Sequence, residues 1–185
     1  LRSFYKYLAN KACIIKINPV AELEYPKLNK TLPKYLEIDE CMRLLEAVNA
    51  TPDDYPFKVR DYAILTLFLN CGMRLSELVG LNLSDIRKDA TVIRVVGKGN
   101  KERIVYLNDA CKTAIQRYLA VRPHEGLRDR DALFISKQRK RISPKTVQYL
   151  VKKYLGEIDL KSGGYSVHKL RHTAATLMYQ YGHVD

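Results

Sequence analysis

The sequence predicts a mainly α-helical fold with a small antiparallel β-sheet. Apolar residues recur at helical spacing in several segments, for example over 36–48 and 110–121. The pattern changes over 91–107, where two β-branched runs flank Gly97-Lys98-Gly99, as expected of a β-hairpin. A further short apolar run, 132–135, is a candidate third strand that could join the hairpin.

The chain of 185 residues is long enough for one medium domain and a small appendage. Residues 1–18 begin inside a helical pattern, which Asn18-Pro19 ends, so we expect the last helix of a truncated N-terminal domain. Residues 19–35 combine closely spaced prolines with lysines and predict an extended basic linker. Residues 36–185 then form the main domain.

The helices of the main domain are expected from apolar periodicity and from their caps. Ser143 followed by Pro144 is a strong helix start, and Asn108 or Asp109 and Ser166 are further candidate caps. The helices are expected at 36–48, 57–69, 76–81, 110–121, 144–155 and 167–181.

The formal net charge of +12 favours a polyanionic partner, nucleic acid first and an acidic membrane surface second. The sequence has no apolar run of membrane-spanning length and no signal-peptide pattern, which favours a cytoplasmic protein. Cys13, Cys41, Cys71 and Cys111 are widely spaced and lie in apolar or helical contexts. Buried reduced thiols are therefore favoured over a metal site or a disulfide.

Gly72 ends the apolar segment that precedes it, as a left-handed or tight-turn position does. If a new helix begins near Arg74, Glu77 lies three residues further on the same face, within reach of the guanidinium. Such an arginine at a helix start suits an anionic oxygen, above all a phosphate. Taken alone, the pair is equally compatible with an ordinary surface ion pair.

Lys98 lies between two glycines in the hairpin turn, from where its side chain can reach a neighbouring site. A nucleotide-binding phosphate loop is excluded, because the turn lacks the required spacing and does not join a strand to a helix. The alternative is a solvated hairpin tip.

His168, Arg171 and His172 are spaced to share one face at the start of the last predicted helix. This arrangement also suits an anion. A zinc site is disfavoured, since Lys169 stands where a metalloprotease motif has glutamate and no third ligand is evident.

Together these three motifs resemble, in the same order, the signature of the tyrosine recombinases, particularly the Xer-like and transposon-integrase branch. Residues 71–78 (CGMRLSEL) resemble that family's TGxRxSEL box, residues 97–103 (GKGNKER) its GKGxKxR hairpin, and residues 166–173 (SVHKLRHT) its PHxLRHT box. The resemblance covers nearly the whole chain. It implies that 1–18 ends a core-binding domain and that the catalytic domain follows from Glu37.

The resemblance implies cleavage and rejoining of double-stranded DNA through a 3′-phosphotyrosyl intermediate, by a homo-oligomer that is a tetramer on DNA. In this interpretation the catalytic residues are Arg74, Lys98, His168 and Arg171. Glu77 and His172 would hold these catalytic residues in position. No metal, nucleotide or other cofactor is expected.

Two departures from the family pattern stand out. Cys71 replaces the usual threonine. The family places a further His or Trp and then the nucleophilic tyrosine on later turns and a later helix, whereas Tyr179 and Tyr181 fall on the helix that carries Arg171. We therefore assign no nucleophile in this chain and expect it to behave as a fragment that does not cleave DNA.

Ten basic residues are predicted to contact DNA phosphates, which makes binding salt-dependent. They are Lys27, Lys30, Lys34, Lys101, Arg103, Lys137, Arg139, Lys140, Arg141 and Lys145. The competing interpretations are a non-catalytic DNA-binding protein and an enzyme like a type IB topoisomerase. An RNA-binding module is disfavoured because no aromatic stacking motif stands out.

Overall fold

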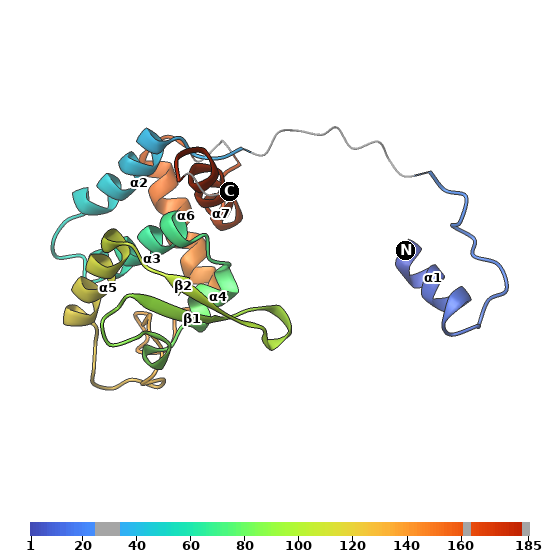
Figure 1. Ribbon diagram of the computed structural model, residues 1–185, viewed down its shortest axis with the longest axis horizontal. Coiled ribbons are helices and arrows are strands. Elements are labelled where there is room, and N and C mark those ends of the chain that lie inside the picture. Colours follow the sequence, from blue (N-terminus) through green and yellow to red (C-terminus); the bar gives the residue numbers. More distant parts are fainter. Residues whose placement is uncertain (25–33, 161–163, 183–185) are drawn as a thin grey trace. The chain divides into compact units, whose positions relative to one another are not determined.

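The computed structural model describes residues 1–24, 34–160 and 164–182, with the backbone alone at Lys98. The chain divides into two compact units, Leu1–Leu32 and Pro33–Asp185 (Figure 1). Two of the predicted DNA contacts, Lys27 and Lys30, lie outside the described residues.

In the first unit the regular structure is the helix α1, Arg2–Asn10. The helix predicted over 1–18 was therefore too long. The backbone of Cys13 has a positive φ of 51°, and three isoleucines follow within four residues, a composition that lowers helix propensity. Cys13 is also exposed, which corrects the expectation that its thiol is buried.

The second unit contains six α-helices among its described residues, each within a few residues of its predicted place. They are α2 (Ile38–Ala50), α3 (Lys58–Cys71), α4 (Leu75–Gly80), α5 (Asp109–Val121), α6 (Pro144–Glu157) and α7 (Val167–Tyr181). Helix α3 packs against α2, α5 and α7. Its residues from Ala63 to Leu69 are all buried because neighbours cover several of its sides.

The predicted hairpin consists of β1 (Val92–Val96) and β2 (Glu102–Tyr106), paired antiparallel with Val96 opposite Glu102. Ile93 and Val95 of β1 are buried, so this strand packs one face on the core. The turn end of the hairpin projects from the helical body in Figure 1.

Residues 132–135 do not join the hairpin, which corrects the candidate third strand. The sheet has two strands, and Ala132 and Ile135 form only isolated bridges, to Asn82 and Arg141. Side chains form hydrogen bonds with backbone groups that would otherwise pair in a β-ladder. The Arg122 guanidinium donates to the carbonyl of Ala132 at 2.6 Å, and the N–H of Ile135 donates to a tyrosine hydroxyl at 3.0 Å.

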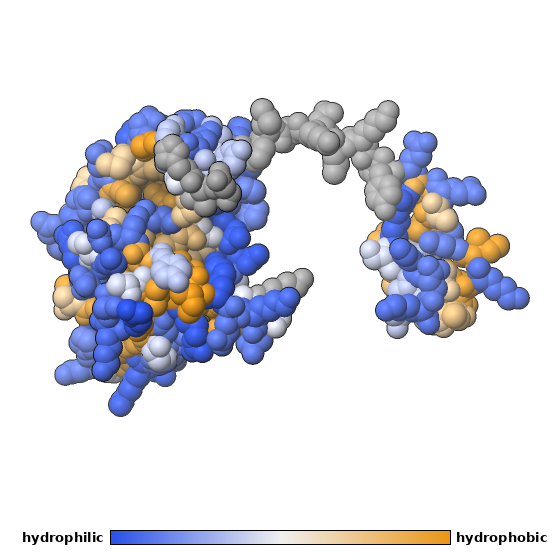
Figure 2. Space-filling view, in the orientation of Figure 1, coloured by the Kyte–Doolittle hydropathy of each residue, from blue (hydrophilic) through white to orange (hydrophobic). Residues whose placement is uncertain are grey.

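The visible face of the second unit is largely hydrophilic, with smaller apolar areas between the charged side chains (Figure 2). Across residues 1–24, 34–160 and 164–182, no helix combines the length and apolar character needed to cross a membrane. Cys41 and Cys111 are buried free thiols as predicted, and Cys71 is half-buried.

Candidate functional site

Gly72 forms the turn that begins the site. It caps α3 in the left-handed conformation, with φ 54° and ψ 35°, and its N–H donates to the carbonyl of Phe68. A Cβ at this position would lie 3.5 Å from the Cβ of Ala174 on α7, so the turn also lies close against that helix. The left-handed turn predicted from the sequence is confirmed, and it directs the chain straight into Arg74.

The predicted contact between Arg74 and Glu77 is present. Arg74 is the N-cap of α4; its N–H donates to Oε2 of Glu77 and its Nη1 to Oε1, both at 2.8 Å. The Glu77 side chain is 1% exposed, whereas that of Arg74 is 54% exposed. The carboxylate is therefore a buried support, and the guanidinium is accessible from solvent.

Arg171 brings α7 to the same place. Its Nη1 donates to the carbonyl of Gly72 at 2.6 Å and lies 4.0 Å from Oε2 of Glu77. The side chain is 33% exposed. Two arginines from distant parts of the sequence thus meet beside one carboxylate, as an anion-binding site requires.

A third arginine, Arg103 of β2, also reaches Glu77, with Nη2 donating to Oε2 at 2.9 Å. Arg103 was predicted as a DNA contact, and this ion pair was not foreseen from the sequence. The strand pattern contained a signal: Arg103 and Val105 alternate with the exposed Glu102, Ile104 and Tyr106, so Arg103 lies on the half-buried face.

Glu77 is surrounded by donors that favour its charged form. Burial alone raises the pKa of this carboxyl. The hydrogen bonds from the N–H and side chain of Arg74, with the charges of Arg103 and Arg74, outweigh burial and hold the pKa below its ordinary value. Glu77 is therefore a stable anion that anchors the surrounding guanidinium groups.

His168 and His172 are both exposed on the first turns of α7, with ring centroids 4.9 Å apart and the rings edge to face. Lys98 lies in the hairpin turn as predicted. The preceding residue, Gly97, is so placed that a Cβ would lie 3.5 Å from Oε1 of Glu77. The turn that carries Lys98 therefore begins next to the arginine cluster.

A cavity of about 730 Å³ adjoins the cluster. Its apolar lining comes from α4, α6 and α7 and from residues just before α4 and α7, and its polar lining includes both site arginines and His168. The lining residues are Met73, Arg74, Leu75, Ser76, Pro144, Gln148, Val151, Lys152, Leu155, Tyr165, Ser166, Val167, His168 and Arg171. The described residues hold no cluster of His, Cys, Asp and Glu that could bind a metal.

Tyr179 and Tyr181 lie on α7, the helix of Arg171, as expected. At the rise of an α-helix they are about 12 and 15 Å along the axis from Arg171. Both side chains are exposed. Neither of them is assigned as the nucleophile.

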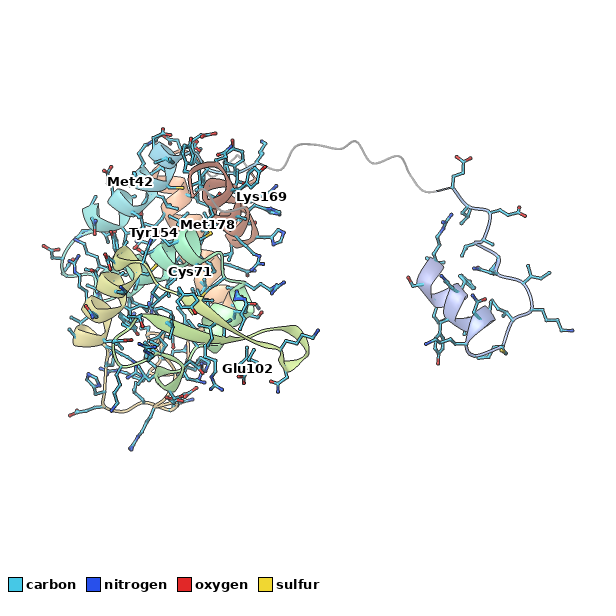
Figure 3. All side chains as sticks on the ribbon, viewed as in Figure 1. Met42, Cys71, Glu102, Tyr154, Lys169 and Met178 are labelled. Atoms are coloured by element: carbon cyan, nitrogen blue, oxygen red, sulfur yellow. The ribbon has the colours of Figure 1, made fainter. Side chains whose placement is uncertain are left out.

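The predicted DNA contacts differ in availability. Arg141 is half-buried, and all three of its guanidinium nitrogens donate to groups of the protein, among them Asp129 and the carbonyl of Leu81. We therefore leave it out of the proposed DNA surface. The exposed members of the predicted set are Lys34, Lys101, Lys137, Arg139, Lys140 and Lys145. Figure 3 shows nitrogen-tipped side chains along the edge of the second unit between Lys169 on α7 and the hairpin at Glu102.

The comparisons with known proteins agree with this geometry. Residues 34–184 match the model of the phage integrase family. The chain is 60% identical over 185 residues to the tyrosine recombinase XerC of Caldanaerobacter subterraneus subsp. tengcongensis, covering 100% of this chain and 50% of that protein. It thus spans about half the length of this relative.

Solved structures show the same fold. The crystal structure of XerA recombinase aligns with a TM-score of 0.71 and 27% identity, covering 99% of this chain and 68% of that one. The XerH site-specific recombinase bound to difH substrate, in a pre-cleavage complex, aligns with a TM-score of 0.72 and 24% identity, covering 87% and 47%.

Proposed function

The chain belongs to the phage integrase family, and from this membership we propose that the protein carrying it is a tyrosine-type site-specific DNA recombinase. It cleaves and rejoins DNA through a 3′-phosphotyrosyl intermediate. The observation that most supports this function is the pair of half-exposed arginines, Arg74 and Arg171, held beside the buried carboxylate of Glu77.

The two arginines supply the charge that phosphoryl transfer needs. Attack on a phosphodiester develops negative charge on the non-bridging oxygens, and each guanidinium can donate two parallel hydrogen bonds to them. Glu77 fixes the guanidinium of Arg74 before DNA binds, so little reorganisation is needed during the reaction. Because the arginines supply this charge, the proposed mechanism uses no metal and no nucleotide cofactor.

Proton transfer falls to Lys98 and His168. A 5′-oxygen leaves poorly unless it receives a proton, and Lys98, on a turn that begins beside the cluster, is the proposed general acid. His168, exposed at the start of α7, accepts the proton of the attacking tyrosine or donates to the phosphate. His172 supports His168 through their edge-to-face contact. We assign the attacking tyrosine to no residue of this chain.

We propose double-stranded DNA as the partner, bound mainly through phosphate contacts by the exposed lysines and arginines of the second unit. Such binding weakens steeply as salt rises. We further propose that a homo-tetramer assembles on DNA and that the protein acts in the cytoplasm, where its DNA substrate lies.

Covalent trapping tests the proposed function. The full-length protein is incubated with nicked duplexes carrying its own recombination site, and the products are separated in SDS. A DNA-linked protein band supports the proposal. Tight binding without a band contradicts it and favours a non-catalytic DNA-binding protein. Relaxation of supercoiled DNA that lacks the site favours an enzyme like a type IB topoisomerase.

A further inference from the structure

Arg103 occupies an unusual position for a predicted DNA contact. It lies on β2 opposite Val95, and its Nη2 donates to Oε2 of Glu77 at 2.9 Å. Its Nη1 is buried and meets no hydrogen-bond acceptor among the described residues. Two of its three guanidinium nitrogens are thus turned into the protein, although the side chain as a whole is 38% exposed.

The two oxygens of Glu77 accept hydrogen bonds from different donors. Oε1 accepts from Nη1 of Arg74, and Oε2 accepts from the N–H of Arg74 and from Arg103, with Arg171 at 4.0 Å. Without Arg103, Oε2 would lose its guanidinium donor at hydrogen-bond distance. The carboxylate could then turn toward Arg171 and release Arg74 from its alignment.

Arg103 also links the hairpin to this carboxylate. It follows the turn of Lys98 on the returning strand, and Gly97 on the outgoing side approaches Oε1 of Glu77. The ion pair therefore fixes the hairpin turn relative to Arg74 in addition to neutralising Glu77.

We propose that Arg103 is a positioning residue of the recombination reaction, which holds Glu77, and through it Arg74, in place for the phosphate. This inference rests on the proposed function. It separates Arg103 from the exposed basic residues, whose loss weakens binding without changing the chemistry of the bound complex.

The experiment compares Arg103→Ala and Arg103→Lys with Arg94→Ala in the full-length protein. Arg94 is a matched control: it lies on the same hairpin, is 47% exposed and pairs with a carboxylate, Asp85, that is 5% exposed, outside the cluster. Each variant is assayed for DNA affinity, for the salt dependence of that affinity and for first-turnover cleavage of a nicked duplex at saturating protein.

We expect Arg103→Ala to slow cleavage about tenfold or more, a smaller effect than the ~10²–10³ expected for loss of a direct phosphate donor. Its DNA affinity should stay within about twofold of wild type. Arg103→Lys should recover part of the rate because it keeps the charge, and Arg94→Ala should match wild type. A unit decrease in salt slope with weaker binding and an unchanged rate would overturn the inference and make Arg103 a phosphate contact.

A carboxyl titration of Glu77 by ¹³C NMR, without DNA, provides a readout that a general structural role would not change. The charge of Arg103 helps to lower the pKa of Glu77, so Arg103→Ala should raise this pKa while Arg94→Ala leaves it unchanged. An unmoved pKa overturns the inference, even if the wild-type protein forms no adduct and the proposed function itself fails. Should Arg103→Ala not fold, the same titration on Arg103→Gln decides.

Discussion

Helix α3 has an arginine–carboxylate cluster at each end, and the two differ in which partner is buried. At its start, Arg60 is 5% exposed and Asp61 is 0% exposed. Just past its end, Glu77 is 1% exposed, but its partner Arg74 is 54% exposed. Both partners of the first cluster, which we call the hidden cluster, are buried, whereas in the second cluster only the carboxylate is buried.

In the hidden cluster each guanidinium nitrogen donates inside the protein. Nε and Nη2 of Arg60 donate to Oδ1 of Asp61, Nη1 donates to the carbonyl of Ile135, and the guanidinium lies 4.2 Å from the centre of the Phe57 ring. Tyr55 donates to the remaining oxygen of Asp61. Both partners are buried and paired with each other, so we assign this cluster to the fold, while the half-exposed arginines around Glu77 are accessible to a substrate.

The two carboxyls also titrate in opposite directions. Burial raises the pKa of Asp61 and outweighs the opposing charge and hydrogen bonds of Arg60. Burial acts in the same sense on Glu77, but donors from Arg74 and Arg103 outweigh it and lower the pKa. The donors around Glu77 therefore keep it ionised, whereas burial favours the protonated form of Asp61.

The largest effect on stability is expected from breaking the hidden cluster. Asp61→Ala leaves the Arg60 guanidinium buried without its counterion, which should cost about 3–5 kcal/mol of unfolding free energy. Urea unfolding measures it. Asp53→Ala is the control, since its ion pair with Lys58 is at the surface and its loss should leave the midpoint unchanged. A loss under about 1 kcal/mol for Asp61→Ala would show that this cluster does not support the fold.

Glu77→Gln should lower both the stability and the activity of the protein. The amide keeps the shape but loses the charge, so we expect about 1–3 kcal/mol of destabilisation and a reduced cleavage rate at unchanged DNA affinity. Unfolding curves and first-turnover assays on the same variant test this. Full cleavage activity after the loss of charge would contradict the supporting role of Glu77.

Gly72→Ala should have a smaller effect on stability. The left-handed backbone is unfavourable for alanine by about 1–2 kcal/mol. The change also disturbs the carbonyl that accepts from Arg171. Gly80→Ala is the control, because its added Cβ would meet nothing within 4 Å and its φ is not positive. Equal thermal midpoints for the two variants would contradict the strained turn.

The smallest and most diagnostic effect is the pH dependence of stability. Glu77 has a lowered pKa, so its contribution is present above the ordinary value of 4.5 and is lost as pH falls through the folded value. Asp61 has a raised pKa, so its ionisation lowers the stability of wild type relative to the neutral amide as pH rises from 3.8 through the folded value, although the ionised carboxylate still pairs with Arg60. Wild type should therefore lose its advantage over Glu77→Gln on acidification and over Asp61→Asn on alkalinisation. If both stability differences changed in the same direction with pH, the contrast between the two carboxyls would be contradicted.

Local spacing predicted the parts of the site that lie close in sequence. The turn at Gly72, the Arg74–Glu77 contact and the position of Arg171 near the start of α7 each depend on a few neighbouring residues. The meeting of Arg103 with Glu77 depends on how the hairpin packs against α4, which spacing does not encode. Its signal was only the alternation along β2.

The structure differs from the expectation at Arg141 and at residues 132–135 for the same reason. Arg141 belongs to a basic run that we expected to be solvated. Its guanidinium instead donates to the carbonyl of Val79 and to the carboxylate of Asp129, both distant in sequence. Residues 132–135 have strand composition, but a buried arginine and a tyrosine hydroxyl bond backbone groups that a ladder would need. In both cases contacts with residues distant in sequence determine the local structure.

In the proposed reaction Arg74 and Arg171 act on one phosphate, with Arg74 held by Glu77 and Arg171 by the carbonyl of Gly72. The most direct test measures covalent adduct formation and DNA affinity for Arg171→Lys in the full-length protein. We predict that affinity changes by less than about threefold and that first-turnover cleavage falls about 10²–10³-fold, because a lysine cannot replace the paired donors of a guanidinium. A large loss of affinity with cleavage retained would contradict this role of Arg171.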